Sequence, residues 1–242
     1  LFSQNADGND LPYMMMQAEG QSRFKDGKPN FVNNETLIKV METIKKMQDH
    51  HVLYLANNWT DYTDQTIKGD MVAGVINGNW IIPTIEQVKD NSGKWEITTM
   101  PTLAGGKDGY AANGGSSLYI TANCKKPDLA KDFLAYTFGG GEGSQETYDG
   151  ALKDGGVITT CISAGKSTAY NDGVAYFNNQ PIYSTIVGMG AKVPVVEQSR
   201  YEYEARTQIG TAIQQVSQGT DIKEALKTAE DQVNFTMQGG AK

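Results

Sequence analysis

The chain has 242 residues, with 21 Lys and Arg against 28 Asp and Glu, which gives a formal net charge of −7. This length fits one large domain or two small ones, and 39% hydrophobic with 20% charged residues is an ordinary globular composition. The acidic balance and the dispersed lysines argue against nucleic acid as a partner, because phosphate binding needs clustered Lys and Arg. No apolar run approaches the roughly 20 residues that cross a bilayer.

The first part of the chain predicts a turn-rich start, a hairpin and a helix. Residues 1–12 are polar and rich in turn formers, and Asp26-Gly27 predicts a hairpin turn within residues 24–31. Asn33 or Asn34 can cap the helix that follows. Apolar residues then recur every three or four positions, which predicts a core-facing stripe formed by Leu37, Val40, Met41, Ile44 and Met47.

The rest of the chain is predicted to form strands separated by helices and irregular stretches. Strands are predicted over residues 71–77, 95–100 and 117–122, and a helix runs from Pro127 to a stop at Gly139. Residues 144–190 are predicted to be irregular. Two helices close the chain, over residues 199–218 and from a capping box at Asp221 to about Met237. The pattern indicates an α/β protein.

The sequence offers little for catalysis or metal binding. His50 and His51 are neighbours on a predicted helix, so their side chains point about 100° apart and cannot chelate one metal well. There is no C-x-x-C, no G-x-S-x-G and no phosphate-binding glycine loop, so we expect no cofactor. Cys124 and Cys161 either pair in an oxidising compartment or remain free thiols.

Six motifs in this order resemble the family 1 extracellular solute-binding proteins of ATP-binding-cassette (ABC) importers. They are Lys68–Trp80, Met100-Pro101, Ala112–Ile120, Lys126–Leu134, Pro194–Gln198 with Tyr201, Tyr203 and Arg206, and Gly219–Leu226. The resemblance implies a periplasmic-binding-protein-like type II fold. It also implies that the chain holds the C-terminal lobe plus the return segment of the N-terminal lobe and lacks that lobe's opening segment.

By the same resemblance, residues 1–116 form the first part of the second lobe, 117–180 the return segment of the first lobe, and 181–242 the closing helices of the second. The chain starts at Leu1 without a signal sequence, so it is either a mature protein or a piece of one. The implied function is non-enzymatic: oligosaccharide binding and delivery to an ABC importer permease by hinged closure. The implied location is extracytoplasmic, with any membrane association through a lipid anchor upstream of this chain.

Sugars present apolar C–H faces and a rim of hydroxyls, which proteins bind with flat aromatic rings and with polar side chains. Trp80 follows the strand predicted over residues 71–77 and matches the family's cleft aromatic; the alternative is a core tryptophan. Trp59 lies in a polar loop and either faces a cleft or caps the preceding helix.

The resemblance places further polar contacts at the ligand. Gly114, Gly115 and Ser116 fall near the family's interlobe crossing, where missing side chains let the backbone approach a ligand; a glycine bend is the alternative. Asn9, Asp10 and Tyr13 fall where the second lobe contributes its first polar contacts, and Glu202 is a separate candidate whose carboxylate could accept sugar hydroxyls. Glu202 stands where relatives often place an aromatic ring.

Two other functions remain open from the sequence. A carboxylate-based glycoside hydrolase requires two carboxylates about 5–10 Å apart across a cleft. A sugar-sensing module would keep the same fold and pass its signal to another protein.

Overall fold

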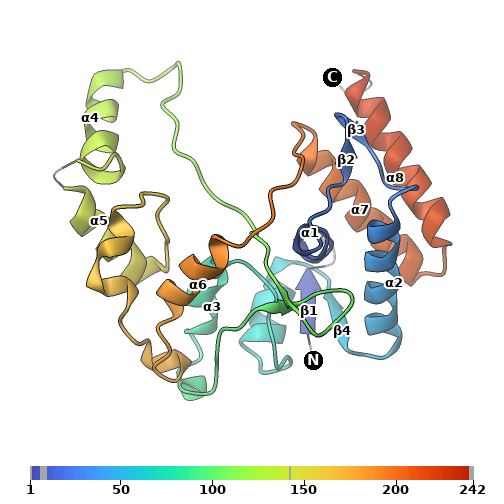
Figure 1. Ribbon diagram of the computed structural model, residues 1–242, viewed down its shortest axis with the longest axis horizontal. Helices are drawn as coiled ribbons and strands as arrows, with labels where there is room; N and C mark the ends of the chain where they lie inside the picture. The colour runs from blue at the N-terminus through green and yellow to red at the C-terminus, as the bar shows by residue number, and fades with distance from the viewer. Residues whose placement is uncertain (1, 6–9, 142, 240–242) are drawn as a thin grey trace. The chain divides into compact units, whose positions relative to one another are not determined.

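The computed structural model describes residues 2–5, 10–141 and 143–239. The chain folds into two compact units, each built from segments that are far apart in sequence (Figure 1). Unit 1 comprises residues 1–77, 99–113 and 192–242, and unit 2 comprises residues 78–98 and 114–191. Residues 78–98 therefore group with 114–191 rather than with the rest of 1–116. The assignment of segments to the lobes of the family stays a prediction.

Unit 1 contains three small sheets and the longest helices of the described chain. Its elements are β1 Phe2–Asn5, α1 Asp10–Ala18, β2 Phe24–Lys25, β3 Lys28–Pro29, α2 Glu35–Asp49, β4 Leu53–Ala56, the π-helix η1 Asp61–Ile67, β5 Met100–Pro101, β6 Asp108–Gly109, α7 Glu202–Ser217 and α8 Ile222–Met237. Strands β1 and β4 pair in parallel, with Phe2 opposite Leu53. The β2–β3 and β5–β6 pairs are antiparallel.

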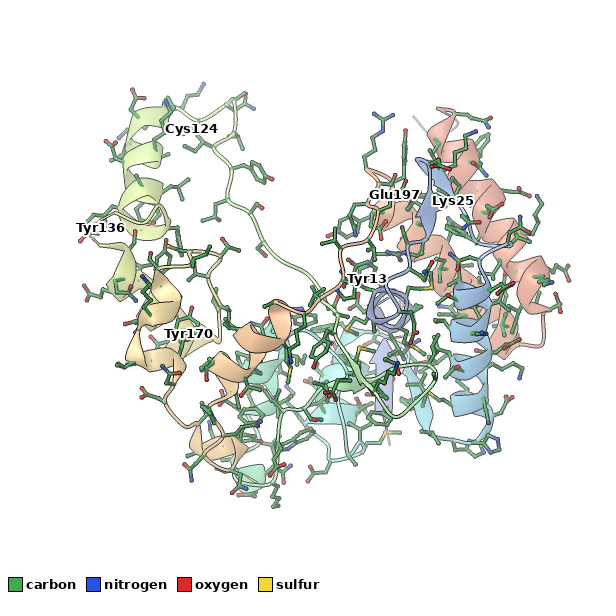
Figure 2. The ribbon with its side chains drawn as sticks, viewed as in Figure 1. Tyr13, Lys25, Cys124, Tyr136, Tyr170 and Glu197 are labelled. Carbon is green, nitrogen blue, oxygen red and sulfur yellow. The ribbon has the colours of Figure 1, made fainter. Side chains whose placement is uncertain are left out.

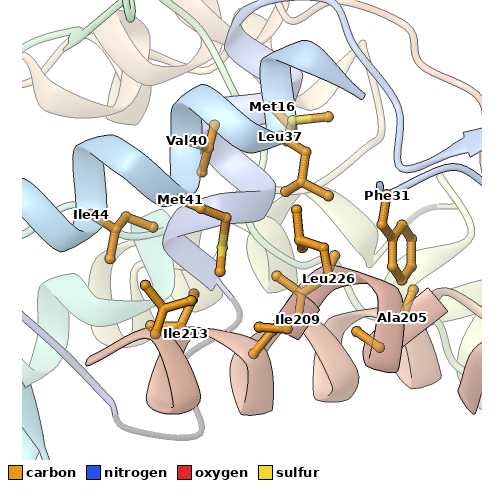
Figure 3. Close-up of a cluster of buried hydrophobic side chains, with 14 of the residues drawn as sticks. Met16, Phe31, Leu37, Val40, Met41, Ile44, Ala205, Ile209, Ile213 and Leu226 are labelled. Carbon is orange, nitrogen blue, oxygen red and sulfur yellow. The ribbon is translucent and has the colours of Figure 1, made fainter. Parts of the chain in front are cut away.

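The hydrophobic core of unit 1 lies where α2, α7 and α8 pack together against α1 (Figures 1 and 3). The predicted stripe on α2 is confirmed, and its residues Leu37, Val40, Met41 and Ile44 are buried. The cap is Asn34, whose side-chain oxygen accepts from the Leu37 N–H at 3.1 Å. Both closing helices also form as predicted, so local periodicity and capping explain this layer.

The predicted hairpin forms and is fastened to the core by one carboxylate. Asp26 and Gly27 both have positive φ, 54° and 74°, as a type I′ turn requires. Oxygen Oε2 of Glu230 on α8 accepts from the backbone N–H groups of Phe31 and Val32 at 2.6 and 3.1 Å. This contact joins residues almost 200 positions apart and holds the segment that follows the hairpin, at Phe31 and Val32, against α8.

Unit 2 is built from short elements. They are the 3₁₀ turn η2 Asn79–Ile81, α3 Ile82–Ile85, η3 Lys89–Asn91, α4 Pro127–Phe138, α5 Ser144–Gly155, η4 Ala164–Lys166, η5 Thr168–Tyr170, η6 Ala175–Phe177 and α6 Ile182–Gly190. The Tyr176 hydroxyl lies 2.7 and 2.8 Å from the carbonyl oxygens of Ile85 and Val88, and Gln180 bonds both the N–H and the C=O of Ile97. These contacts hold residues 78–98 to the later segment.

Several local predictions are wrong. Residues 71–77 and 117–122 form no strand, and of residues 95–100 only Met100 enters one. A strand needs a partner backbone, and among the described residues none pairs as a strand with residues 71–77, 95–99 or 117–122. Residues 144–190, predicted to be irregular, contain α5 and α6. Cys124 and Cys161 are free thiols in the structure.

In the described part of the chain, no helix is both long and apolar enough to cross a membrane.

Replacing Glu230 with Gln should destabilise the protein by about 1–3 kcal/mol, because the charged acceptor of two backbone N–H groups is lost. The matched control is Asp231→Asn on the same helix, which removes only an exposed ion pair to Lys227 and should cost below about 0.5 kcal/mol. Urea unfolding midpoints measure both changes, and equal losses would contradict the assigned role of Glu230.

Candidate functional site

Two helices of unit 1 place charged side chains together at one position. On α1, Asp10 and Tyr13 are about one turn apart, and on α7 so are Glu202 and Arg206. Arg23, which precedes the hairpin, forms an ion pair with Glu202, and Arg206 forms one with Asp10. We call these five residues the arginine cluster. Three of them, Asp10, Tyr13 and Glu202, are ligand-contact residues expected from the sequence.

The ring of Tyr13, which is labelled in Figure 2 on α1, joins the two ion pairs through its contacts with both arginines. The guanidinium carbons of Arg23 and Arg206 lie 4.7 and 5.3 Å from its centroid, within cation–π range. Arg206 also lies 5.7 Å from the ring of Tyr203, which is 81% exposed. The cluster therefore carries an aromatic ring at its core and another at the surface.

Burial sets the electrostatics of the cluster. Arg23 is only 2% exposed, and desolvation lowers its pKa to about 10, against an opposing electrostatic effect of Tyr13. Burial also lowers the pKa of Arg206. With a pKa of about 10, Arg23 keeps its charge at neutral pH. Its position therefore depends on the paired carboxylate.

A chain of amide hydrogen bonds extends from the cluster. The Asn113 amide nitrogen donates to Asp10 Oδ2 at 3.1 Å and to Asn77 Oδ1 at 2.7 Å. The Asn77 amide nitrogen donates to the Tyr62 hydroxyl at 3.0 Å. Asn77 and Asn113 are the last residues of unit 1 before the chain passes into unit 2. The chain of bonds thus links a predicted ligand residue to two of these crossings.

At Tyr62 the chain of hydrogen bonds meets the ring of Trp59, another predicted ligand residue. The rings of Trp59 and Tyr62 have centroids 5.4 Å apart and are tilted by 45°. Tyr62 is buried, and this raises its pKa, against the opposing effect of the Asn77 hydrogen bond. Trp59 is 47% exposed and lies two residues before the π-helix η1 begins at Asp61. Short π-helical segments are frequent at functional sites.

Of the remaining predicted residues, Trp80, Gly114, Gly115 and Ser116 lie in unit 2. Trp80 is 39% exposed, and a Cβ added at Gly114 would lie 3.4 Å from its indole nitrogen. Gly114 and Gly115 have φ of +100° and +135°, so both need glycine's conformational freedom. Ser116 is exposed. Asn9 lies outside the described residues.

The structure thus brings Asp10, Tyr13, Glu202 and Trp59 into one network, and it places Gly114 against Trp80. The sequence did not single out Arg23, Tyr62, Asn77 or Asn113 for the site. Arg23 is the most important residue that the sequence analysis missed, and its one signal was a charged side chain directly before the predicted hairpin. The sequence analysis included Arg206 in the motif at the penultimate helix, but only the folded structure shows that it pairs with Asp10.

A groove of about 530 Å³ also opens in unit 1, and its lining includes Ser22 and Phe24 on either side of Arg23 but none of the five residues of the arginine cluster. The hairpin, the start of α2 and residues 195–197 line it. Two of its polar side chains already serve the fold: the Glu197 carboxylate accepts from the N–H groups of Asp26 and Gly27 at 3.2 and 2.7 Å, and Asn34 caps α2. We therefore place the candidate site at the arginine cluster. Among the described residues, no group of three His, Cys, Asp or Glu could hold a metal ion.

The sequence profile of a family described as bacterial extracellular solute-binding protein matches residues 1–178. The chain belongs to this family. The predicted membership in the extracellular solute-binding proteins is confirmed, and the family consists of solute-binding proteins rather than enzymes.

Two curated relatives of this solute-binding chain have sugar-binding names. A lactose-binding protein of Rhizobium radiobacter is 30% identical over 230 residues, which cover 93% of this chain and 54% of the relative. An arabinooligosaccharide-binding protein of Bacillus subtilis is 24% identical, over 55% of this chain and 32% of the relative. The chain therefore spans about half the length of the first relative.

Solved structures confirm the predicted type II periplasmic-binding fold. The binding protein of B. animalis subsp. lactis Bl-04 in complex with β-1,6-galactobiose matches with a TM-score of 0.75 and 19% identity, over 98% of this chain and 62% of that one. The maltodextrin-binding domain MalE of Bdellovibrio bacteriovorus, bound to maltotriose, matches with a TM-score of 0.72 and 16% identity, over 98% and 60%. At these identities the likeness establishes the fold.

Replacing Glu202 with Gln should destabilise the protein by about 3 kcal/mol, because it leaves the buried Arg23 charge without its carboxylate. The control is Glu204→Gln in the same helical turn, whose partner is the neutral Gln208 amide, with an expected loss below about 0.5 kcal/mol. Thermal and urea unfolding measure the loss of stability of both variants. A Glu202 variant no weaker than the Glu204 variant would refute the pairing.

Proposed function

We propose that this chain provides a sugar-contacting surface of an extracytoplasmic carbohydrate-binding protein that delivers its ligand to an ABC importer permease. The observation that carries the proposal is the network of unit 1. It combines exposed rings at Trp59 and Tyr203 with two carboxylates, one paired with the buried Arg23 and one with the partly buried Arg206. Rings of this kind bind sugar C–H faces, and fixed carboxylates accept sugar hydroxyls.

The geometry of Asp10 favours hydroxyl binding. Its carboxylate is about one-third exposed, at 36%, while Arg206 and Asn113 hold it from the protein side. A carboxylate oriented in advance loses little freedom when a ligand arrives, which favours affinity. The relatives supply the ligand class: their names include lactose, β-1,6-galactobiose and maltotriose, so we propose a di- or oligosaccharide.

We propose that hinged closure accompanies binding. The chain passes between the units at residues 77/78, 98/99, 113/114 and 191/192. Glycines follow two of these crossings, at Gly78 and Gly114, and such residues absorb the backbone rotation of a hinge. Asn113 bonds both Asp10 and Asn77, so ligand contacts at Asp10 would bias two crossings at once.

Replacing Trp59 with Ala should weaken sugar binding by about 1–3 kcal/mol if the ring stacks on the sugar. Calorimetric titration of the 242-residue chain with lactose, β-1,6-galactobiose and maltotriose measures this. The control is Phe235→Ala, a similarly exposed aromatic at 53% on α8 outside the network, which should leave the affinity unchanged. Equal affinities of the two variants would show that Trp59 does not contact the sugar. If the unaltered chain binds none of these sugars, the proposed function is wrong.

Trp80 tests the contribution of unit 2 separately. If unit 2 contacts the sugar, Trp80→Ala should weaken the binding free energy by about 1–3 kcal/mol in the same titrations. Tyr119→Ala is the control, since Tyr119 is 85% exposed and lies five residues beyond Gly114. Unchanged binding by the Trp80 variant would restrict the ligand contacts to unit 1.

A further inference from the structure

The sequence contains two Asn-Gly pairs, Asn77-Gly78 and Asn113-Gly114, and each stands at a crossing between the units. The two asparagine side chains also contact each other, since the Asn113 amide nitrogen donates to Asn77 Oδ1 at 2.7 Å. Asparagine is a thermally labile residue, and it is most labile before glycine because no Cβ shields the backbone nitrogen that follows. Both labile pairs therefore belong to the chain of hydrogen bonds that runs from Asp10 to Tyr62.

The reaction at such a pair, deamidation, needs only water. The Gly114 backbone nitrogen loses its proton and forms a bond to Cγ of Asn113, while the bond from Cγ to the amide nitrogen breaks and ammonia leaves. Water then adds to one carbonyl of the resulting cyclic imide and opens the ring. Position 113 becomes aspartate or isoaspartate, so one amide and one water have become one carboxylic acid and one ammonia.

Two hydrogen bonds hold the Asn113 side chain against this reaction. Its amide nitrogen donates to Asp10 Oδ2 at 3.1 Å as well as to Asn77, and the residue is only 8% exposed. Gly114, in contrast, is exposed. Because the amide nitrogen leaves during the reaction, both of its hydrogen bonds must break first. The rate therefore follows the population in which this part of the structure has opened.

A carboxylate at position 113 would face two acceptors. Asp10 Oδ2 and Asn77 Oδ1 each receive an N–H from Asn113, and an ionised carboxylate has none to give. Against Asp10 it would also place like charge beside like charge. The chain of hydrogen bonds would be broken at this point, and it could not re-form because the ammonia has left.

The same reaction at Asn77 would have a smaller effect. The Asn77 amide nitrogen donates to the Tyr62 hydroxyl at 3.0 Å, and a hydroxyl can turn and donate to a carboxylate instead. Asn113 can still donate to the other carboxylate oxygen. The two Asn-Gly pairs thus share their chemistry but differ in its consequence.

We propose that Asn113-Gly114 is a spontaneous modification site, protected by the hydrogen bonds to Asp10 and Asn77, whose deamidation permanently separates Asp10 from the crossing residues. The modification goes beyond the proposed function, because it needs no ligand. Its consequence for sugar binding rests on that function, since Asp10 is the carboxylate that these contacts orient. The reaction sets a chemical lifetime on the oriented carboxylate.

Peptide mapping by mass spectrometry in water enriched in heavy oxygen follows the reaction without any sugar, because each opened imide takes up one oxygen from the solvent. The 242-residue chain is incubated at mildly alkaline pH, either folded or in guanidinium chloride. Without structure both pairs should react at similar rates, and folding should slow Asn113 by on the order of 10-fold or more. An Asn113 that reacts equally fast in the folded chain would overturn the proposal, and so would no reaction in the unfolded chain.

An acceptor variant tests the source of the protection. Asp10→Ala should speed deamidation of Asn113 in the folded chain by on the order of 10-fold, because the leaving amide loses one of its hydrogen bonds. The control is Asp108→Ala, whose carboxylate accepts from Thr99 outside this chain of bonds, and it should leave the rate unchanged. Circular dichroism verifies that both variants are folded. An unchanged rate in a folded Asp10 variant would contradict the proposed protection.

Two variants that imitate the products test the consequence and do not depend on the Asp10 variant. Asn113→Asp should raise the unfolding equilibrium constant on the order of 10- to 100-fold in urea, because donors are replaced by an acceptor. Asn77→Asp should raise it less than about 5-fold, because Tyr62 can donate. Equal losses, or a larger loss for Asn77→Asp, would show that deamidation at position 113 does not break the chain of hydrogen bonds as proposed.

Discussion

The burial of one positive charge constrains how unit 1 is built. Arg23 is almost fully inaccessible, and an uncompensated guanidinium there would cost several kcal/mol. Glu202 supplies the compensating charge from α7 and Tyr13 supplies a ring from α1. The residue before the hairpin, the first turn of α7 and the first helix must therefore meet at one place. Because α7 also packs with α2 and α8, that place is anchored in the hydrophobic core.

This constraint determines what the surface around it can do. Arg206 and Asn113 both contact the Asp10 carboxylate. From Asn113, hydrogen bonds lead through Asn77 to Tyr62, whose ring contacts Trp59. The exposed carboxylate and rings are consequently oriented before any ligand arrives. Sites supported by such contacts on helices bind more precisely than sites on unsupported loops. The proposed sugar site thus follows from how the fold satisfies a buried arginine.

Local signals and distant contacts explain what the sequence could and could not predict. The helices α2, α7 and α8 were predictable because their apolar periodicity and caps are local. Strands over 71–77 and 117–122 were not, because a short apolar run becomes a strand only when a partner pairs with it. Asp10 and Glu202 were predicted from the family resemblance, and Trp59 from its position in a polar loop. Asn113 contacts a residue 103 positions away, so no local pattern could indicate its role.

The most direct test of the central claim is nuclear magnetic resonance of the side-chain N–H groups during titration with a disaccharide. If the arginine cluster and its chain of bonds form the sugar surface, the shifts of the Trp59 indole N–H and the Asn77 and Asn113 amides should change together and saturate at one affinity. Sugar binding that leaves these three signals unmoved, and instead shifts the Asn30 and Asn33 amides that line the separate groove, would contradict it.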